Sequence, residues 1–410
     1  MPRSTWQIVS VSELAAPKRN ALVGGPFGSN LVSADYVEKG VPVIRGQNMG
    51  QGRWVEGEFV FVRPQKADDL SANLAIPGDL VFTQRGTLGQ VALVPQGAYE
   101  RYVVSQSQMK LSVNETVACP LFLYYFFSSQ EQIRYIKANS IQTGVPHTNL
   151  GHLRATRLEL PPLDEQRSIS RVLGSLDDKI ELNRRMNQTL EAMARAIFKS
   201  WFVDFDPIKY CPYSFSTTFE SVGIGPVPKG WDIGRLDDLL VLQRGFDLPS
   251  IRRSAGRYPV MAASGPSGTH VEAMVKGPGV TTGRSGVLGN VYLVFEAFWP
   301  LNTSLWVKEF RRARPAYAYF LLQTLDLSMF NSGSAVPTLN RNHVHGLPLA
   351  VPPLQIIQKF EEVALPLLKL CHLRELESRN LATLRDTLLP KLLSGEIRVK
   401  QAEKMVGEVA

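Results

Sequence analysis

The sequence predicts an α+β fold in which two similar domains are separated by two long antiparallel coiled-coil-like helices, giving an internal pseudo-two-fold repeat. Three observations support this prediction. The chain of 410 residues is too long for one ordinary domain. Short segments recur in the same order in its two halves. Each half ends in a long stretch whose apolar residues have helical spacing.

The repeat extends through both halves of the chain. PGDLVFTQRGTLGQVALV at 77–94 matches PGVTTGRSGVLGNVYLV at 278–294, since both contain Arg, then Gly, then LG-x-V-x-LV. Four further pairs keep the same order: GVPVIRGQN with RYPVMAASG, PLFLYYFF with PAYAYFLL, GVPHTN with AVPTLN, and LPPL with VPPL. This conserved order indicates a duplication.

Each copy begins with short strand-like runs that Gly and Pro interrupt, which is typical of a compact α+β domain. In the first copy we expect one helix near Phe122–Ala138. We place the first domain at 1–163 and the second at 229–353. A linker at 201–228, rich in aromatic residues, Ser and Pro, precedes the second domain.

The two spacer helices are expected at 164–200 and 354–395, with a tail at 396–410. Asn183 interrupts the apolar stripe of the first helix and could fix its register. Pro366 should kink the second helix or delay its start. Each stripe could pack on its own domain. We favour antiparallel packing of the two stripes against each other, with a domain at each end, because that arrangement buries both.

Composition and charge restrict the class of protein. The net charge of +8 favours a polyanionic partner, with nucleic acid ahead of an anionic membrane. The chain start lacks the apolar region of a secretory signal, and the densest apolar run, Leu121–Phe127, is far shorter than the ~20 residues of a membrane span. Cys119, Cys211 and Cys371 are odd in number and far apart, so we expect a reducing cytoplasm. The scattered histidines predict no metal site.

Several of these segments together resemble the specificity subunits of Type I restriction-modification systems: PVIRGQN, PGDLVFTQRGTLGQVALV, VVSQSQMKLSV, TGVPHTNL and LPPLDEQRSI. The resemblance covers nearly the whole chain. It implies that 1–163 and 229–353 are target recognition domains, each for one half of a split DNA sequence. It further implies that the helices hold these domains apart, that two methyltransferase subunits dock, and that restriction (translocase or nuclease) subunits can join.

The second copy departs from the family pattern at two places. The junction becomes PPLQIIQ, which weakens any docking role for Glu165 and Gln166 in both halves. RGQN becomes AASG, which fits a different base preference in the second domain. Because the polar loops differ most between the copies, we expect an asymmetric bipartite target rather than a palindrome.

Side chains able to contact DNA are the candidate site residues. Arg pairs with guanine and Gln or Asn with adenine, while cations contact phosphates. Arg85 and Arg284 precede a glycine in both copies, which favours a turn or a phosphate contact over a base contact. For each candidate an ordinary polar loop residue is the alternative. The candidates are Arg45, Gln47, Asn48, Gln84, Arg85, Gln106 and Gln108 in the first domain, and Arg244, Arg252, Arg253, Arg257, Arg284 and Asn302 in the second.

Catalytic motifs are missing from the sequence. Amino-methyltransferases need (N/D/S)PP(Y/F), but double prolines occur only in LPPL and VPPL. GPGVTTGRSG has the wrong spacing for a phosphate loop, with Arg in place of Lys, and is interpreted as a strand and turn. We therefore expect no enzyme activity and no cofactor on this chain, with S-adenosylmethionine on the partner methyltransferase. The alternatives are an unfamiliar nuclease or methyltransferase, and a coiled-coil scaffold without a DNA role.

Overall fold

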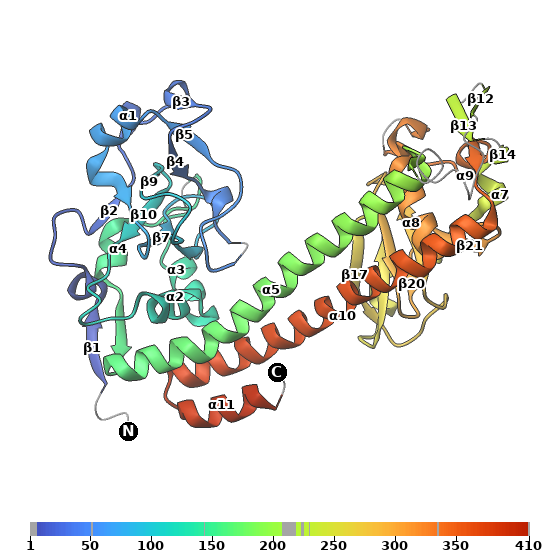
Figure 1. Ribbon diagram of the computed structural model, residues 1–410. Coiled ribbons are helices and arrows are strands. Elements are labelled where there is room, and N and C mark those ends of the chain that lie inside the picture. The colour runs from blue at the N-terminus through green and yellow to red at the C-terminus, as the bar shows by residue number, and fades with distance from the viewer. Residues whose placement is uncertain are drawn as a thin grey trace. The chain divides into compact units, whose positions relative to one another are not determined.

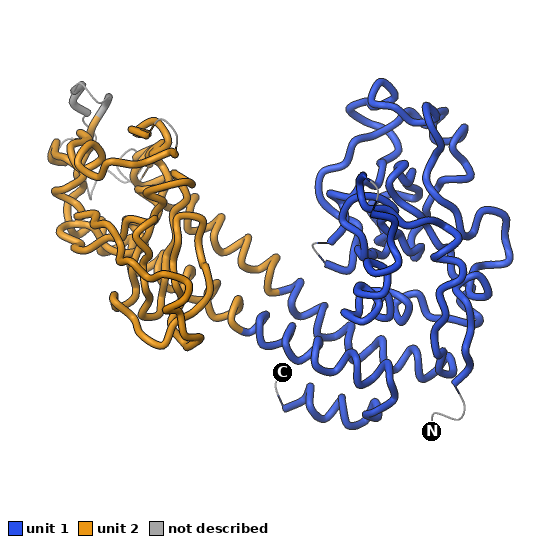
Figure 2. The backbone as a smooth tube through the Cα atoms, turned by 180° about the vertical axis from the view of Figure 1, so that it is seen from behind, with its two compact units in different colours: residues 1–182, 377–410 blue, residues 183–376 orange. Residues whose placement is uncertain are grey.

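The computed structural model describes residues 6–50, 52–142, 144–206, 219–222, 225–228, 230–333 and 336–408. The chain divides into two compact units (Figure 2): unit 1 consists of 1–182 and 377–410, and unit 2 of 183–376. Both units contain helices and sheets, so the predicted α+β class is confirmed. The boundary between the units falls inside the two long helices. Half of the predicted linker, including Cys211, lies outside the described residues.

Unit 1 is built on two sheets of short strands. The first is antiparallel, with the order β2-β10-β7-β8: β2 (Leu22–Gly24), β10 (Gln108–Leu111), β7 (Leu80–Thr83) and β8 (Val91–Leu93). The second has the order β3-β5-β4-β9-β6: β3 (Tyr36–Val37), β5 (Val60–Val62), β4 (Val41–Ile44), β9 (Tyr102–Val104) and β6 (Leu74–Ala75). Strands β4 and β9 are parallel, whereas the separate pair β1 (Gln7–Ser10) and β11 (Arg157–Leu160) is antiparallel.

The predicted helix near Phe122–Ala138 is two helices, α2 (Pro120–Ser128) and α3 (Gln130–Ala138). Ser129 separates them because its backbone is extended, and its hydroxyl accepts a hydrogen bond from the Gln132 N–H to cap α3. The ring of Phe127 packs edge-on against Phe82 of the sheet, with 4.8 Å between centroids. The shorter helices of unit 1 are α1 (Pro64–Asp69) and α4 (Leu150–Ala155).

Unit 2 repeats the strand order of the four-stranded sheet of unit 1, but its second sheet has only three strands. The four-stranded antiparallel sheet has the order β15-β21-β18-β19: β15 (Leu240–Arg244), β21 (Ser304–Phe310), β18 (Gly279–Gly283) and β19 (Val291–Val294). GPGVTTGRSG supplies β18 and the following turn, as predicted. The second sheet has the order β17-β16-β20: β17 (Gly265–His270), β16 (Tyr258–Ala262) and β20 (Trp299–Pro300). Strands β16 and β20 are parallel, like β4 and β9. The remaining elements are β12 (Phe219–Val222), β13 (Gly225–Pro228), β14 (Asp232–Arg235), β22 (Pro348–Val351), α7 (Leu236–Leu239), α8 (Pro315–Thr324) and α9 (Arg341–His345).

The long helices are α5 (Leu163–Phe202) and α10 (Leu354–Leu393). Of the two effects predicted at Pro366, a kink or a delayed start, the delayed start is wrong, since α10 begins at Leu354 and continues through the proline. Pro366 is exposed, so water can reach the backbone carbonyl that loses its N–H partner. The last residues are not merely a tail, because α11 (Val399–Gly407) packs on unit 1 with Ala402 buried in its core (Figure 1).

Within each unit the two long helices pack antiparallel. In unit 1, Asp177 bonds to Arg385 and Lys179 pairs with Glu377, so residue numbers rise along α5 as they fall along α10. In unit 2 the pairs are Phe198 with Phe360, and Asn187 with Cys371. The predicted apolar stripe is only partly buried. Five of its members are exposed: Met186, Met193, Val363, Leu370 and Leu373.

Candidate nucleic-acid interface

In unit 1 several loops meet at the turn 105–107, which joins β9 to β10. The Ser105 N–H donates to the carbonyl of Ile44, where β4 ends. The carbonyl of Ser107 accepts from the Gln84 N–H at 2.7 Å and from the Arg85 N–H at 3.3 Å, just after β7. These bonds gather the loops at 24–31, 45–48, 84–86 and 105–107, here called the first loop cluster. It brings together Arg45, Gln47, Gln84, Arg85 and Gln106 from positions far apart in the sequence.

The loop after β2 needs glycine to approach this turn. A Cβ on Gly25 would lie 2.0 Å from the carbonyl oxygen of Ser105, which no side chain tolerates. Unit 2 has the same restriction, because a Cβ on Gly245 would lie 2.2 Å from the carbonyl oxygen of Leu301. Both glycines follow the first strand of the four-stranded sheet, so the same loop packs on the same turn in each unit.

Two candidates of the first domain are structural. Asn48 is buried, its Oδ1 accepts from the Arg45 N–H at 3.0 Å, and its Nδ2 donates to the carbonyls of Glu56 and Glu58. Gln108 is buried inside β10, where its Oε1 accepts from the Ser105 hydroxyl. Neither side chain can reach a base in this structure, so both leave the set of candidates.

The other candidates of the first loop cluster reach its surface to different degrees. Gln47 is exposed and donates from Nε2 to the Glu58 carbonyl at 3.1 Å, while Arg85 is exposed. Gln84 and Arg45 are half-buried, and the buried Nε of Arg45 has no acceptor among the described residues. Gln106 is exposed, but its Nε2 donates to the Gly28 and Leu31 carbonyls. The side-chain amide hydrogens of Gln106 are thus already hydrogen-bonded within the protein.

The corresponding turn of unit 2, 301–303, gathers charged groups. The carbonyl of Thr303 accepts from the Arg284 N–H at 2.9 Å, and Arg284 Nη1 donates to the Asn302 carbonyl at 3.0 Å. Asp247 pairs with Arg244 at 3.6 Å and also accepts from the Asn302 amide. Burial and the charge of Arg244 lower the pKa of Arg284, and Asp247 partly opposes this effect. The loops at 244–253, 284–286 and 301–303 form the second loop cluster.

The hydrogen bonds correct the predicted pairing of Arg85 with Arg284. The Thr148 N–H donates to the Gln84 carbonyl at 2.9 Å, and the Leu339 N–H donates to the Arg284 carbonyl at 2.8 Å. Arg284 therefore corresponds to Gln84, and Arg85 corresponds to Ser285. The sequence alignment of the two copies was wrong by one residue here, because Arg85 directly precedes the shared glycine whereas Ser285 separates Arg284 from it.

Three arginines of the second domain have different surroundings. Arg252 is exposed in the 3₁₀ turn Ser250–Arg252 of the second loop cluster. Arg253 is half-buried and donates to the carbonyls of Leu248 and Ser267, so it fixes the loop. Arg257 stacks on the Tyr258 ring, with 4.7 Å from its guanidinium carbon to the ring centroid. It precedes β16, whereas the cluster lies beyond the other end of that strand, so the structure does not bring Arg257 to the cluster.

Sequence reasoning missed Asp247 and two exposed apolar residues. Phe27 is 89% exposed in the loop after β2, and Ile251 is 92% exposed in the loop after β15. A signal for Phe27 was available, since it stands between Gly25-Pro26 and Gly28, where no strand or helix can bury it. Asp247 was likewise visible in the sequence as an acidic residue within a basic loop. Its hydrogen bond from the Asn302 amide could be known only from the structure.

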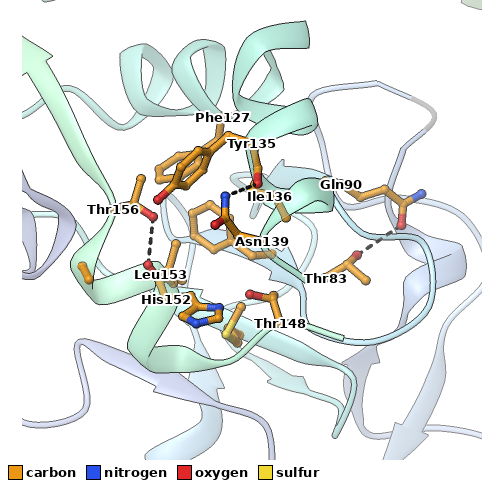
Figure 3. Close-up of a pocket in the computed structure, with 14 residues that line it drawn as sticks. Thr83, Gln90, Phe127, Tyr135, Ile136, Asn139, Thr148, His152, Leu153 and Thr156 are labelled. Atoms are coloured by element: carbon orange, nitrogen blue, oxygen red, sulfur yellow. Dashed lines mark hydrogen bonds between the residues drawn. The ribbon is translucent and has the colours of Figure 1, made fainter. Parts of the chain in front are cut away.

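A cavity of about 110 Å³ in unit 1 is lined by residues of β7, α3 and α4, among others (Figure 3). Phe82, Met109 and Phe127 contribute apolar walls. Polar groups around it bond within the protein: Thr83 Oγ1 donates to Gln90 Oε1 at 3.2 Å, and Asn139 Nδ2 donates to the Tyr135 carbonyl at 2.9 Å. Small-molecule sites usually measure about 300–1,000 Å³, so this cavity is too small for a nucleotide-sized cofactor.

The junction between the first domain and α5 is also structural. Gln166 is buried, its Oε1 accepts from the Cys119 N–H at 2.8 Å, and its Nε2 donates to the Pro161 carbonyl at 2.8 Å. Glu165 accepts from the Trp6 indole N–H at 3.3 Å. In unit 2, Glu361 accepts from the Ala316 N–H at 3.0 Å, and burial raises its pKa. In each unit a side chain of the long helix thus accepts from a backbone N–H at the start of a helix that precedes it in the chain, α2 in unit 1 and α8 in unit 2.

Among the described residues, no cluster of three or more His, Cys, Asp or Glu side chains is arranged to hold a metal ion. Nor does any described helix have the length and apolar character that crossing a membrane requires.

Comparisons with known proteins relate the whole chain to one group. Residues 33–192 match the family model of the Type I restriction modification DNA specificity domain. The Type I restriction enzyme MjaIX specificity subunit of Methanocaldococcus jannaschii is 25% identical, with 97% of this chain and 94% of the relative aligned. The Type I restriction enzyme HindI specificity subunit of Haemophilus influenzae is 24% identical, with 78% and 86% aligned. The crystal structure of a Type-I restriction-modification system S subunit from M. genitalium shares the fold, with a TM-score of 0.61, 17% identity, and 94% and 96% coverage.

Proposed function

The chain belongs to the specificity subunits of Type I restriction-modification systems, and on this premise we propose that it binds an asymmetric bipartite DNA site without catalysing a reaction. One observation carries the proposal: two loop clusters stand on sheets of the same strand order but differ in chemistry. Gln84 of the first corresponds to Arg284 of the second, and Gln106 corresponds to Asn302. Two equivalent surfaces with different side chains suit two different half-sites.

We further propose that 1–163 and 229–353 are the two target recognition domains and that each loop cluster faces the DNA of its half-site. Arg45, Gln47, Gln84 and Arg85 are the contact candidates of the first domain, with Arg244, Arg252 and Arg284 in the second. The partners are double-stranded DNA, two methyltransferase subunits that hold S-adenosylmethionine, and in some complexes restriction subunits. The assembly acts in the cytoplasm, and this chain itself holds no cofactor.

In this proposal α5 and α10 form an antiparallel coiled-coil-like spacer between the domains, related by a pseudo-two-fold repeat. The contacts of Asp177 with Arg385 and of Asn187 with Cys371 support such pairing. Seven residues inserted after Leu182 in α5 and seven before Glu377 in α10 would lengthen the spacer by about 10 Å. At 3.4 Å per base pair, the gap should grow by about three base pairs while both half-sites stay unchanged. An unchanged gap would rule out the spacer role.

The test of DNA binding uses the chain co-expressed with its methyltransferase. Affinity for duplex DNA is measured between 50 and 200 mM salt, where six or more phosphate contacts predict a loss of about a thousandfold or more. A coiled-coil scaffold without a DNA role predicts weak binding that salt hardly changes. Weak, salt-insensitive binding would therefore contradict the proposed function and favour the scaffold.

A further inference from the structure

Each loop cluster projects one apolar side chain almost completely into solvent. Phe27 is 89% exposed and Ile251 is 92% exposed. Both belong to the loop that follows the first strand of the four-stranded sheet, β2 in unit 1 and β15 in unit 2. Covering such a side chain removes apolar surface from water and is therefore favourable. Because an exposed apolar side chain recurs in the same loop of both units, although at different positions within that loop, a scattered surface hydrophobic residue is a poor account of it.

The loop around Phe27 is held in place on both sides. Gly25 packs directly on the turn at Ser105, where a Cβ would meet the carbonyl oxygen at 2.0 Å. On the other side, Gln106 Nε2 donates to the carbonyls of Gly28 and Leu31. These contacts fix the backbone on which the Phe27 ring is mounted, so little order has to be gained when the ring is covered.

Different residues hold the loop around Ile251 in the same way. Arg253 donates from Nε to the Leu248 carbonyl at 3.3 Å and from Nη1 to the Ser267 carbonyl at 3.2 Å. The Asn302 amide donates to Asp247 at the start of the loop. Asn302 occupies the turn position that Gln106 occupies in unit 1, so a side-chain amide restrains the same loop in both units.

Each of the two apolar side chains shares its loop cluster with arginines. The turn that restrains the Phe27 loop through Gln106 also binds the Arg85 backbone through the Ser107 carbonyl. The residue after Ile251 is the exposed Arg252, and the Asn302 turn carries Arg284. A loop cluster that holds both a fixed apolar side chain and arginines is complementary to duplex DNA, in which stacked bases lie inside and phosphates lie outside.

We propose that Phe27 and Ile251 are wedges, each of which enters the base stack at one step of its half-site. Gln106 and Asn302 are positioning residues that hold the wedge loops, rather than base contacts. This inference rests on the proposed DNA-binding function. Proteins that bend DNA commonly insert Phe, Leu, Ile or Met between base pairs, accepting the cost of unstacking in return for a better fit.

The test uses the full chain in complex with its methyltransferase and duplexes that carry the mapped target. The adenine analogue 2-aminopurine, whose fluorescence rises when it is unstacked, replaces in turn each adenine of the duplex that is not itself a methylated base. We expect one responsive step in each half-site. Phe27→Ala should abolish the response in one half-site only, and Ile251→Ala in the other only. Phe27→Leu should keep most of it. Gln106→Ala should weaken the same step as Phe27→Ala.

The control is Ile8→Ala, which removes another exposed apolar side chain of unit 1, on β1, outside both sheets of the loop cluster. It should leave both responses intact. If the wild-type complex binds the target with steep salt dependence but no step depends on Phe27 or Ile251, the wedge inference is wrong while the proposed function stands. If Phe27→Ala instead releases the methyltransferase, the residue belongs to a protein interface and the inference is also wrong. Absence of salt-sensitive binding by the wild type would overturn the function itself.

Discussion

Asp177 of α5 and Arg385 of α10 meet in unit 1, with 2.7 Å between Oδ1 and Nη1. The second carboxylate oxygen of Asp177 accepts from the Tyr125 hydroxyl at 2.6 Å. One carboxylate therefore joins both long helices to α2 of the first domain. Burial lowers the pKa of Arg385, but the charge and hydrogen bond of Asp177 outweigh burial, so its pKa is raised overall.

Asp177→Ala should destabilise this junction strongly. The Asp177 side chain is 12% exposed, and its removal leaves the Tyr125 hydroxyl without its partner and the Arg385 guanidinium with only the exposed Asp386. We expect the free energy of opening of α10 after Glu377 to fall by about 3 kcal/mol, measured by hydrogen exchange. The control is Lys179→Ala, which breaks the more exposed pair with Glu377 and should cost less than about 1 kcal/mol. Equal effects of the two variants would contradict this explanation.

The buried pair of Lys110 and Asp79 should respond asymmetrically to substitution. Their nitrogen and oxygen lie 3.6 Å apart, with 6% and 5% of the side chains exposed. Asp79→Asn leaves a buried ammonium uncompensated and should lower the free energy of unfolding of unit 1 by about 3–5 kcal/mol. The double variant Asp79→Asn, Lys110→Met removes that charge and should recover most of the loss in chemical denaturation. If the double variant does not recover stability, the uncompensated charge of Lys110 is not the cause of the destabilisation.

Lowering the pH should destabilise unit 2 through the protonation of His345. Its Nε2 accepts a hydrogen bond from the Leu242 N–H at 2.9 Å, and burial lowers its pKa from the ordinary 6.5, an effect that Asp237 partly opposes. The unfolded chain therefore binds the proton more readily, and stability is lost as pH falls below about 6.5 until the lowered folded-state pKa is passed. His345→Gln should reduce this loss in melting curves at pH 7 and pH 5. His343→Gln, which changes an exposed neighbour, should behave as wild type.

Arg85→Ala should weaken binding to all DNA sequences alike, because we assign this exposed side chain to a phosphate. The slope of the logarithm of affinity against the logarithm of salt concentration should become less steep by about one. Arg101→Ala is the matched control, since Arg101 precedes β9 at the end away from the loop cluster and pairs with Asp68. A loss confined to one target base would instead make Arg85 a base contact.

Periodicity and repetition predicted most of the fold. The starts and ends of both long helices lie within two residues of their predicted positions, because many regularly spaced apolar residues define them. Local reasoning was wrong where tertiary context decides. Ser129 breaks a run that looks helical, while Pro366 is tolerated on an exposed helix face.

The site was harder to predict, because residue type and sequence position do not show which side-chain atoms are already hydrogen-bonded within the protein. Asn48 and Gln108 have side chains suited to adenine, yet both are buried with their oxygens bonded inside the protein. The equivalence of Gln84 with Arg284 needed the hydrogen bonds from Thr148 and Leu339, which lie more than fifty residues away in each copy. Exposure of Phe27 and Ile251 likewise depends on what packs against their loops.

The central claim is that this chain determines a split DNA target. The most direct measurement is a genome-wide map of methylated bases in cells that express the methyltransferase with and without this chain. We predict methylation at a two-part asymmetric motif with a fixed gap, and its loss when the chain is omitted. Methylation that persists without the chain, or that follows a short continuous palindrome, would contradict the claim.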